Sequence, residues 1–116
     1  IDFEVEPSRK AGTWIVGEGT VHHMAFQVGS HAEQDQLKLH LEAMGYTDVS
    51  DVKNRGYFDS IYVRTPSGAM FEATVTHDDC FTCDEPRDKL GLEVMLAPQL
   101  KMSREEMLAQ LGYLKD

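Results

Sequence analysis

The stretch Ser60–Val75 reads SIYVRTPSGAMFEATV and predicts two short strands joined by a tight turn. The turn is indicated by Pro66, which fixes φ, and by Gly68, which adopts positive φ at little cost. If Pro66 to Gly68 form the loop, the antiparallel pairing places Tyr62 opposite Glu72. Directly paired Cβ atoms lie roughly 4.5–5.5 Å apart. The sequence therefore predicts a phenol beside a carboxylate on one face of a hairpin.

The carboxylate of Glu72 belongs to a strand that is otherwise apolar. An unpaired charge in such a place is costly unless something binds it. We interpret the bound partner as a metal ion. Side chains alternate across a strand, so Tyr62 shares the face of Glu72, whereas Ile61 and Val63 lie on the opposite face.

An earlier strand and a helix precede this hairpin. Thr20–Val28, reading TVHHMAFQV, is rich in the β-branched and aromatic residues that favour strands. Ser30 and Glu33 form a capping-box pattern, S-x-x-E, which predicts a helix from about His31 to Met44. The expected buried stripe of that helix is Leu37, Leu41 and Met44, and Gly45 is the expected residue after its end.

A weak strand over Asp48–Lys53 completes the predicted order of strand, helix and three strands. The expected fold class is α+β, with a βαβββ module. The helix is expected to cover one face of the sheet, formed by Met24, Phe26, Ile61, Val63, Phe71 and Ala73. His23, Tyr62 and Glu72 fall on the other face, which is left for solvent, a partner or a site.

The chain divides into three parts by composition. Residues 1–19 show no clear period, and the chain starts at Ile1 without an initiator Met. We expect them to connect to something upstream; an arm that packs on a neighbour and a disordered leader are the alternatives. Residues 20–76 form the βαβββ module. Residues 77–116 form a C-terminal tail, in which a second capping box, Ser103 to Glu106, predicts a short helix up to Gly112.

Composition limits the classes of partner. The 116 residues are 41% hydrophobic and 27% charged, as in an ordinary globular domain, and the net charge is −9. This charge argues against binding to nucleic acid or to an anionic membrane surface. No apolar run approaches the ~20 residues that cross a bilayer. The two cysteines, Cys80 and Cys83, favour a reducing cytoplasm, and their CxxC spacing without a second pair is best read as incidental.

Four side chains on or near the predicted sheet suggest chemistry. His23 and Glu72 offer an imidazole and a carboxylate, which suit a divalent transition metal, although two ligands do not complete a site. Tyr62 is a candidate general acid or base, or a contact for an anionic substrate oxygen. Arg55 is a candidate for offsetting substrate charge. From spacing alone, structural roles for all four residues stay open.

The strand GTVHHMAFQV, the helix, and the stretch NRGYFDSIYVRTPSGAMFEAT together resemble the vicinal oxygen chelate superfamily. This superfamily includes glyoxalase I, bleomycin-resistance proteins and type I extradiol dioxygenases. The likeness covers about Gly19 to Pro86 and is greatest to the C-terminal part of ring-cleaving dioxygenases of the hydroquinone type. The specific features are the pair His22-His23 and the spacing R-x6-Y-x9-E, formed here by Arg55, Tyr62 and Glu72.

The resemblance implies a role for each of these positions. His23 and Glu72 would be ligands of Fe(II), or alternatively of Mn(II), with O2 as co-substrate. His22 would contact either a metal ligand or the substrate. Arg55 and Tyr62 would steer the substrate hydroxyl and the bound oxygen. Strict alternation sends His22 to the face opposite His23, so its role requires a twist or bulge at the start of the strand.

The resemblance also implies that this chain is incomplete as an enzyme. Members of the family carry several βαβββ units, and a further histidine ligand comes from a unit that this sequence lacks. We expect the C-terminal part of an Fe(II)-dependent extradiol-type dioxygenase for a catechol or hydroquinone. The chain would then be inactive alone, or would pair with the N-terminal part or with a second copy in a homo-oligomer. The alternatives are a metal-free aromatic or drug-binding module and a glyoxalase-like isomerase.

Overall fold

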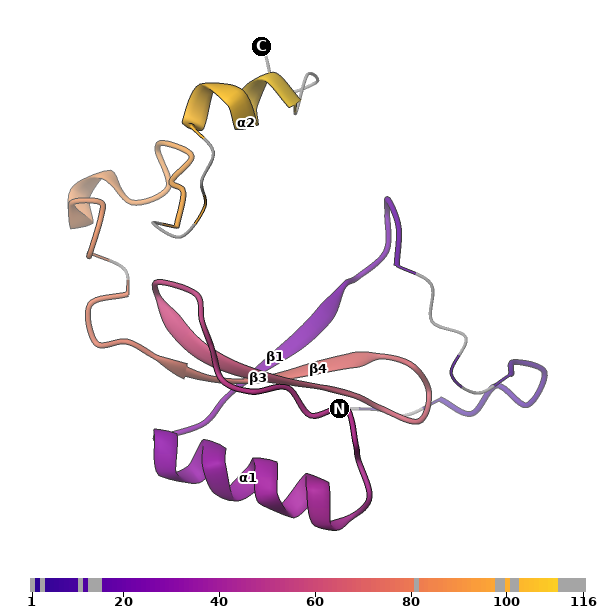
Figure 1. Cartoon of the computed structure of the whole chain (residues 1–116). Coiled ribbons are helices and arrows are strands. Elements are labelled where there is room, and N and C mark those ends of the chain that lie inside the picture. The colour runs from indigo at the N-terminus through magenta and orange to yellow at the C-terminus, as the bar shows by residue number, and fades with distance from the viewer. Residues whose placement is uncertain are drawn as a thin grey trace. The chain divides into compact units, whose positions relative to one another are not determined.

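The structure is a computed structural model, and it describes residues 2, 4–10, 12, 16–80, 82–97, 100 and 103–110. Its elements in chain order are β1 (His23–Gln27), α1 (His31–Ala43), β2 (Lys53–Asn54), β3 (Phe58–Arg64), β4 (Met70–Thr76), η1 (Arg87–Lys89) and α2 (Arg104–Gln110). The predicted α+β class and the order of strand, helix and three strands are therefore confirmed (Figure 1).

The chain forms two compact units. The first comprises Ile1–Lys53 and Ser60–Val75, and the second comprises Asn54–Asp59 and Thr76–Asp116. The first unit holds β1, α1 and most of the hairpin of β3 and β4. The division into a connector, a module and a tail that the sequence suggests stays a prediction.

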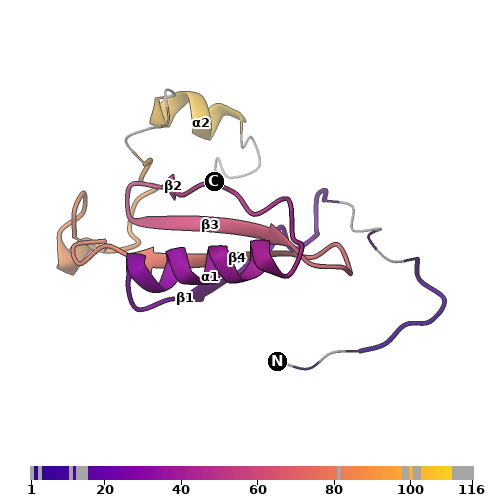
Figure 2. The same ribbon diagram turned by 60° about the horizontal axis from the view of Figure 1, so that its bottom comes forward.

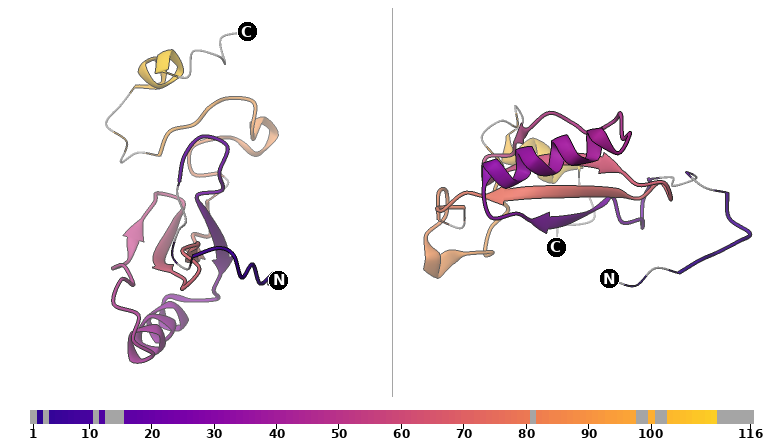
Figure 3. Two further views of the ribbon diagram at one scale, coloured as in Figure 1. Left: turned by 90° about the vertical axis from the view of Figure 1, so that its right-hand side faces the viewer. Right: turned by 90° about the horizontal axis from the view of Figure 1, so that it is seen from below.

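The four strands form one sheet in the order β1-β4-β3-β2. Strand β1 runs parallel to β4, with His23 paired to Met70 and Ala25 paired to Glu72. Helix α1 connects β1 to the rest of the sheet and lies along one of its faces (Figures 2 and 3). The other face of β1 and β4 is thus the one that carries His23 and Glu72.

The hairpin has the predicted loop. The Thr65 amide donates to the Ala69 carbonyl at 2.9 Å, and the Gly68 amide donates to the Thr65 carbonyl at 2.8 Å. Gly68 has a φ of 93°, the left-handed region that glycine adopts without strain. Continued along the strands, the pairing of Thr65 with Ala69 places Tyr62 opposite Glu72, as the sequence predicts.

Helix α1 begins where the capping box predicts. The Ser30 side chain accepts a hydrogen bond from the Glu33 amide at 3.2 Å. In return, Glu33 Oε2 accepts from the Gly29 amide at 2.8 Å. The helix ends at Ala43, and Gly45 follows with a φ of 95°, as expected of the residue that terminates a helix.

The apolar layer between α1 and the sheet contains most of the residues predicted for it. A small hollow of 210 Å³ there is lined by Phe26, Val28, Leu37, Leu41, Ile61, Val63, Phe71 and Ala73. Glu72 also borders this hollow, although its carboxylate bonds to Tyr62 and His23 on the other face. Two predicted members are wrong, because Met24 and Met44 are 47% and 57% exposed. Met24 belongs to the outermost strand, and Met44 is the C-cap beyond the last helical turn.

One buried helix residue has no signal in the apolar pattern. Gln34 is 0% exposed, and its Nε2 donates to the Ala73 carbonyl at 2.8 Å. This bond joins α1 to the backbone of β4. The buried face of the helix therefore includes a polar side chain that a hydrophobic stripe cannot predict.

The strand bounds also differ from the predictions. Strand β2 covers Lys53–Asn54, whereas the sequence suggests Asp48–Lys53. Part of the predicted segment still contacts β3, since the Ser50 amide donates to the Tyr62 carbonyl at 2.9 Å. Its irregular path explains why only two residues have strand geometry.

In the second unit, the capping box of α2 is confirmed. The Glu106 amide donates to Ser103 Oγ at 3.2 Å, and the Ser103 amide donates to Glu106 Oε2 at 2.8 Å. The predicted end of this helix at Gly112 lies outside the described residues. The three-residue element η1 has no counterpart in the predictions.

Candidate metal centre

His23 and Glu72 meet on the open face of the sheet. His23 Nε2 lies 2.8 Å from Glu72 Oε2, although the two residues are on different strands. Because β1 pairs Ala25 with Glu72, His23 reaches Glu72 diagonally across the parallel pair. The His23 side chain is 37% exposed and that of Glu72 only 2%. The pair thus combines a buried carboxylate with an accessible imidazole.

Tyr62 contacts the same carboxylate from the neighbouring strand. Its hydroxyl donates to Glu72 Oε1 at 2.8 Å. Its ring also lies edge-on to the ring of His23, with centroids 6.0 Å apart. Three residues from three strands therefore form one cluster, and the hairpin register is what places the phenol there.

His22 lies beside His23 despite the alternation argument. The Nδ1 atoms of the two rings are 2.8 Å apart, and the rings are edge-on with centroids at 5.1 Å. Strand β1 begins at His23, so His22 precedes the strand and is not bound by its alternation. The role of His22 toward the substrate stays a prediction.

Arg55 belongs to the second unit. Its backbone amide donates to the Phe58 carbonyl at 2.8 Å, in the bend that leads into β3. Its proposed contact with the substrate stays a prediction.

The donor set fits a divalent transition metal in part. Two ligands about 2.1 Å from a common ion and at right angles to each other lie about 3 Å apart. The separation of 2.8 Å between His23 Nε2 and Glu72 Oε2 is close to that value. Among the residues that the structure describes, no group of three or more His, Cys, Asp or Glu side chains could hold a metal. A complete centre therefore requires a ligand beyond this set.

A second histidine–carboxylate pair lies in the second unit. His77 Nε2 is 3.1 Å from Asp59 Oδ2, and His77 Nδ1 is 3.2 Å from the Gly56 carbonyl. The hydrogen bond to Asp59 raises the pKa of His77 above its usual 6.5, and burial opposes this effect. This pair is not among the predictions from the sequence, although His77 directly follows β4 and Asp59 is in β3.

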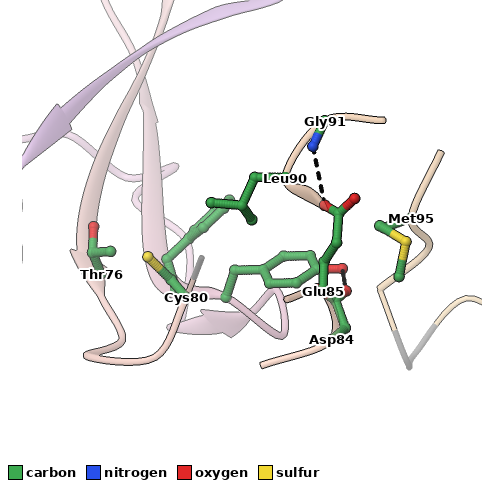
Figure 4. A pocket seen from close by; sticks show the side chains of 9 residues that line it. Thr76, Cys80, Asp84, Glu85, Leu90, Gly91 and Met95 are labelled. Atoms are coloured by element: carbon green, nitrogen blue, oxygen red, sulfur yellow. Dashed lines mark hydrogen bonds between the residues drawn. The ribbon is translucent and has the colours of Figure 1, made fainter. Parts of the chain in front are cut away.

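The second unit also contains a cavity of 610 Å³ (Figure 4). It is lined by Tyr57, Phe58, Thr76, Cys80, Asp84, Glu85, Leu90, Gly91 and Met95. The Tyr57 hydroxyl donates to Asp84 Oδ2 at 2.5 Å, which raises the pKa of Tyr57 to about 12. No sequence pattern predicts this cavity, because its walls come from separate segments of the chain.

The chain is similar to several known proteins over most of its length. It is 52% identical over 112 residues to the chlorohydroquinone/hydroquinone 1,2-dioxygenase of Sphingobium indicum, covering 97% of this chain and 34% of that protein. It is 36% identical over 95 residues to MhqA of Bacillus subtilis, named as a candidate ring-cleaving dioxygenase, covering 82% of this chain and 29% of MhqA. The chain thus spans about a third of the length of these relatives.

One solved structure has a similar fold. A candidate dioxygenase from Bacillus subtilis aligns with a TM-score of 0.63 and 28% identity, over 84% of this chain and 30% of that one. No family model matches the sequence. Within the described residues, none of the helices has the length and apolar character needed to cross a membrane.

Proposed function

We propose that this chain, which belongs to the vicinal oxygen chelate superfamily, forms part of an Fe(II)-dependent ring-cleaving dioxygenase for a catechol or hydroquinone. The observation that carries the proposal is the contact of His23 with the buried carboxylate of Glu72. The names of the relatives support ring cleavage as the reaction class.

His23 and Glu72 would hold the metal, with Mn(II) as the alternative to Fe(II). Such an ion supplies a centre that binds both a ring diol and O2. An imidazole and a carboxylate are two members of the facial triad that is typical of non-haem iron oxygenases. The remaining histidine would come from the N-terminal part of the same protein or from a second copy of the chain.

The other residues of the cluster would manage charge and protons. The hydroxyl of Tyr62, which bonds to the ligand carboxylate at 2.8 Å, would steer the substrate hydroxyl and the bound oxygen. His22, next to His23, would contact the substrate and exchange a proton with its hydroxyl. Arg55 would offset the negative charge of the ionised diol.

The proposed setting is a reducing cytoplasm, because Cys80 and Cys83 are both free thiols. The proposed partners are a small aromatic diol and the rest of the enzyme, in a homo-oligomer. The net charge of −9 gives no basic surface for nucleic acid.

The test uses the intact protein that contains this chain. Metal analysis and oxygen consumption with hydroquinone are measured for wild type, His23→Ala and a matched control, His40→Ala, on the exposed surface of α1. We expect His23→Ala to lose both bound iron and oxygen consumption, and His40→Ala to keep both. Full iron content in His23→Ala would refute the assignment.

The cavity of Figure 4 favours one alternative, metal-free binding of an aromatic molecule. Its 610 Å³ falls within the range of small-molecule sites, and Tyr57, Phe58, Leu90 and Met95 give it apolar walls. For a binding module of this kind, chelation would leave affinity for the aromatic ligand unchanged. For a glyoxalase-like isomerase, turnover would proceed without oxygen consumption.

A further inference from the structure

The two oxygens of Glu72 have different partners. Oε1 accepts a hydrogen bond from the Tyr62 hydroxyl at 2.8 Å. Oε2 lies 2.8 Å from His23 Nε2. The carboxylate is only 2% exposed, so both of its oxygens are shielded from water, whereas the His23 side chain is 37% exposed. The oxygen on the His23 side is therefore the one that can share a cation with His23.

We propose that Tyr62 is a positioning residue for Glu72. Its hydroxyl holds Oε1 and leaves Oε2 as the single oxygen that binds the metal. This role rests on the proposed function and differs from the steering of a substrate hydroxyl. In this role the Tyr62 hydroxyl donates its hydrogen bond to Glu72 even when no substrate is bound.

The hairpin explains why this bond forms. Thr65 and Ala69 are joined by a ladder hydrogen bond, and antiparallel pairs alternate between hydrogen-bonded and non-hydrogen-bonded types. Tyr62 and Glu72 lie three pairs further along, so they form a non-hydrogen-bonded pair. Side chains are closest in pairs of this type, which brings the phenol within reach of the carboxylate.

The chemistry of the pair makes the bond directional. A phenol keeps its proton near neutral pH and therefore donates, and an ionised carboxylate can only accept. Bonds of this charge-assisted kind are stronger than those between neutral groups. Loss of the hydroxyl would leave a buried oxygen without that donor, free to turn toward a cation and chelate it with both oxygens.

The first test is a crystal structure of the intact wild-type protein loaded with Co(II), a spectroscopic substitute for Fe(II). We expect Glu72 Oε2 alone on the metal, with the Tyr62 hydroxyl still bonded to Oε1. Chelation by both oxygens, or a Tyr62 hydroxyl bonded elsewhere, would overturn the proposal. This experiment uses no variant, so it does not depend on a substitution being tolerated.

The second test compares Tyr62→Phe with Tyr57→Phe in the intact protein. Both substitutions remove a phenol that donates to a carboxylate, but Tyr57 bonds to Asp84 in the second unit. Co(II) titration followed by visible absorption measures affinity and ligand geometry. We expect Tyr62→Phe to weaken Co(II) binding by about 10–100-fold, as outer-shell changes do, and to alter the spectrum. Tyr57→Phe should match wild type.

The outcomes separate this inference from the proposed function. Unchanged affinity and spectrum in Tyr62→Phe, with normal binding in wild type, would overturn the positioning role alone. Binding of Co(II) that survives Glu72→Gln would overturn the metal centre itself and the positioning role with it. Hydroquinone turnover adds a further readout. If Tyr62 acts by positioning Glu72, Tyr62→Phe lowers metal occupancy, and excess metal partly restores its turnover.

Discussion

At the scale of single residues, His77 shows how two acceptors favour the protonated form of an imidazole. Its ring nitrogens face Asp59 Oδ2 and the Gly56 carbonyl, neither of which can donate. Both contacts are satisfied as hydrogen bonds only by an imidazolium, and the nearby charge of Asp79 also favours that form. The raised pKa of His77 thus follows from its surroundings.

This pair predicts a pH dependence of stability. Because the pKa of folded His77 is raised above 6.5, the stabilisation is complete below about pH 6.5 and is lost as pH rises through the folded value. We measure the free energy of unfolding in urea as the pH rises from about 6.5 through the folded pKa of His77. Wild type should lose a few tenths to about 1 kcal/mol more of this free energy than His77→Asn. The prediction would be contradicted if the free energy of unfolding had the same pH dependence in the two proteins. Asp59→Asn should lower the pKa of His77 measured by NMR.

The candidate site was partly predictable at this scale. Tyr62 and Glu72 could be placed together because alternation and turn chemistry are local rules. The approach of His23 to Glu72 depends on which strands are neighbours, so the sequence could give only a shared face. Alternation sent His22 to the face opposite His23 because the predicted strand included it, whereas the strand begins at His23 and the two rings lie side by side. Gln34 looks like a solvent-facing residue until its bond to the Ala73 carbonyl is known.

At the scale of elements, the β3–β4 hairpin keeps one register along its length. The pairing of Thr65 with Ala69 near the loop agrees with a bond from the His77 amide to the Tyr57 carbonyl at 3.0 Å at the other end. No residue is inserted between these two points. Since a slip of one residue would turn every side chain to the other face, the loop determines where Glu72 points.

The loop gives a prediction for Gly68. Its φ of 93° is unfavourable for any side chain, so Gly68→Ala should destabilise the protein by about 1–2 kcal/mol. The matched control is Gly17→Ala, where an added Cβ would meet no atom within 4 Å. Chemical unfolding of both variants measures the difference. Equal stability of the two variants would show that the loop tolerates a side chain.

The helices and strands differ in how well nearby residues in the sequence predict their bounds and pairing. Both helices begin at their capping boxes because the bonds that cap a helix form between residues three apart in sequence. Strand β2 was misplaced because its two residues owe their geometry to a neighbouring strand and not to their own propensity. The parallel pairing of β1 with β4 joins segments far apart in sequence, and no local pattern reports it.

At the scale of the whole molecule, the chain spans 34% of its Sphingobium relative and, within its described residues, groups only two of the ligands that the proposed centre needs. We therefore predict that the 116-residue chain alone binds Co(II) far more weakly than the intact protein and consumes no oxygen with hydroquinone. Both proteins are compared by calorimetry and with an oxygen electrode. Robust ring cleavage by the short chain would refute the need for another ligand.

The place of β1 at the end of the strand order has a consequence for regulation. The imidazole of His23 is carried by a border strand, which has β4 on one flank only among the described residues. A segment docking along the opposite flank would align its own side chains with that imidazole. Where that segment belongs to a second copy of the chain, association of the two copies would complete the iron site, and dilution would release the iron.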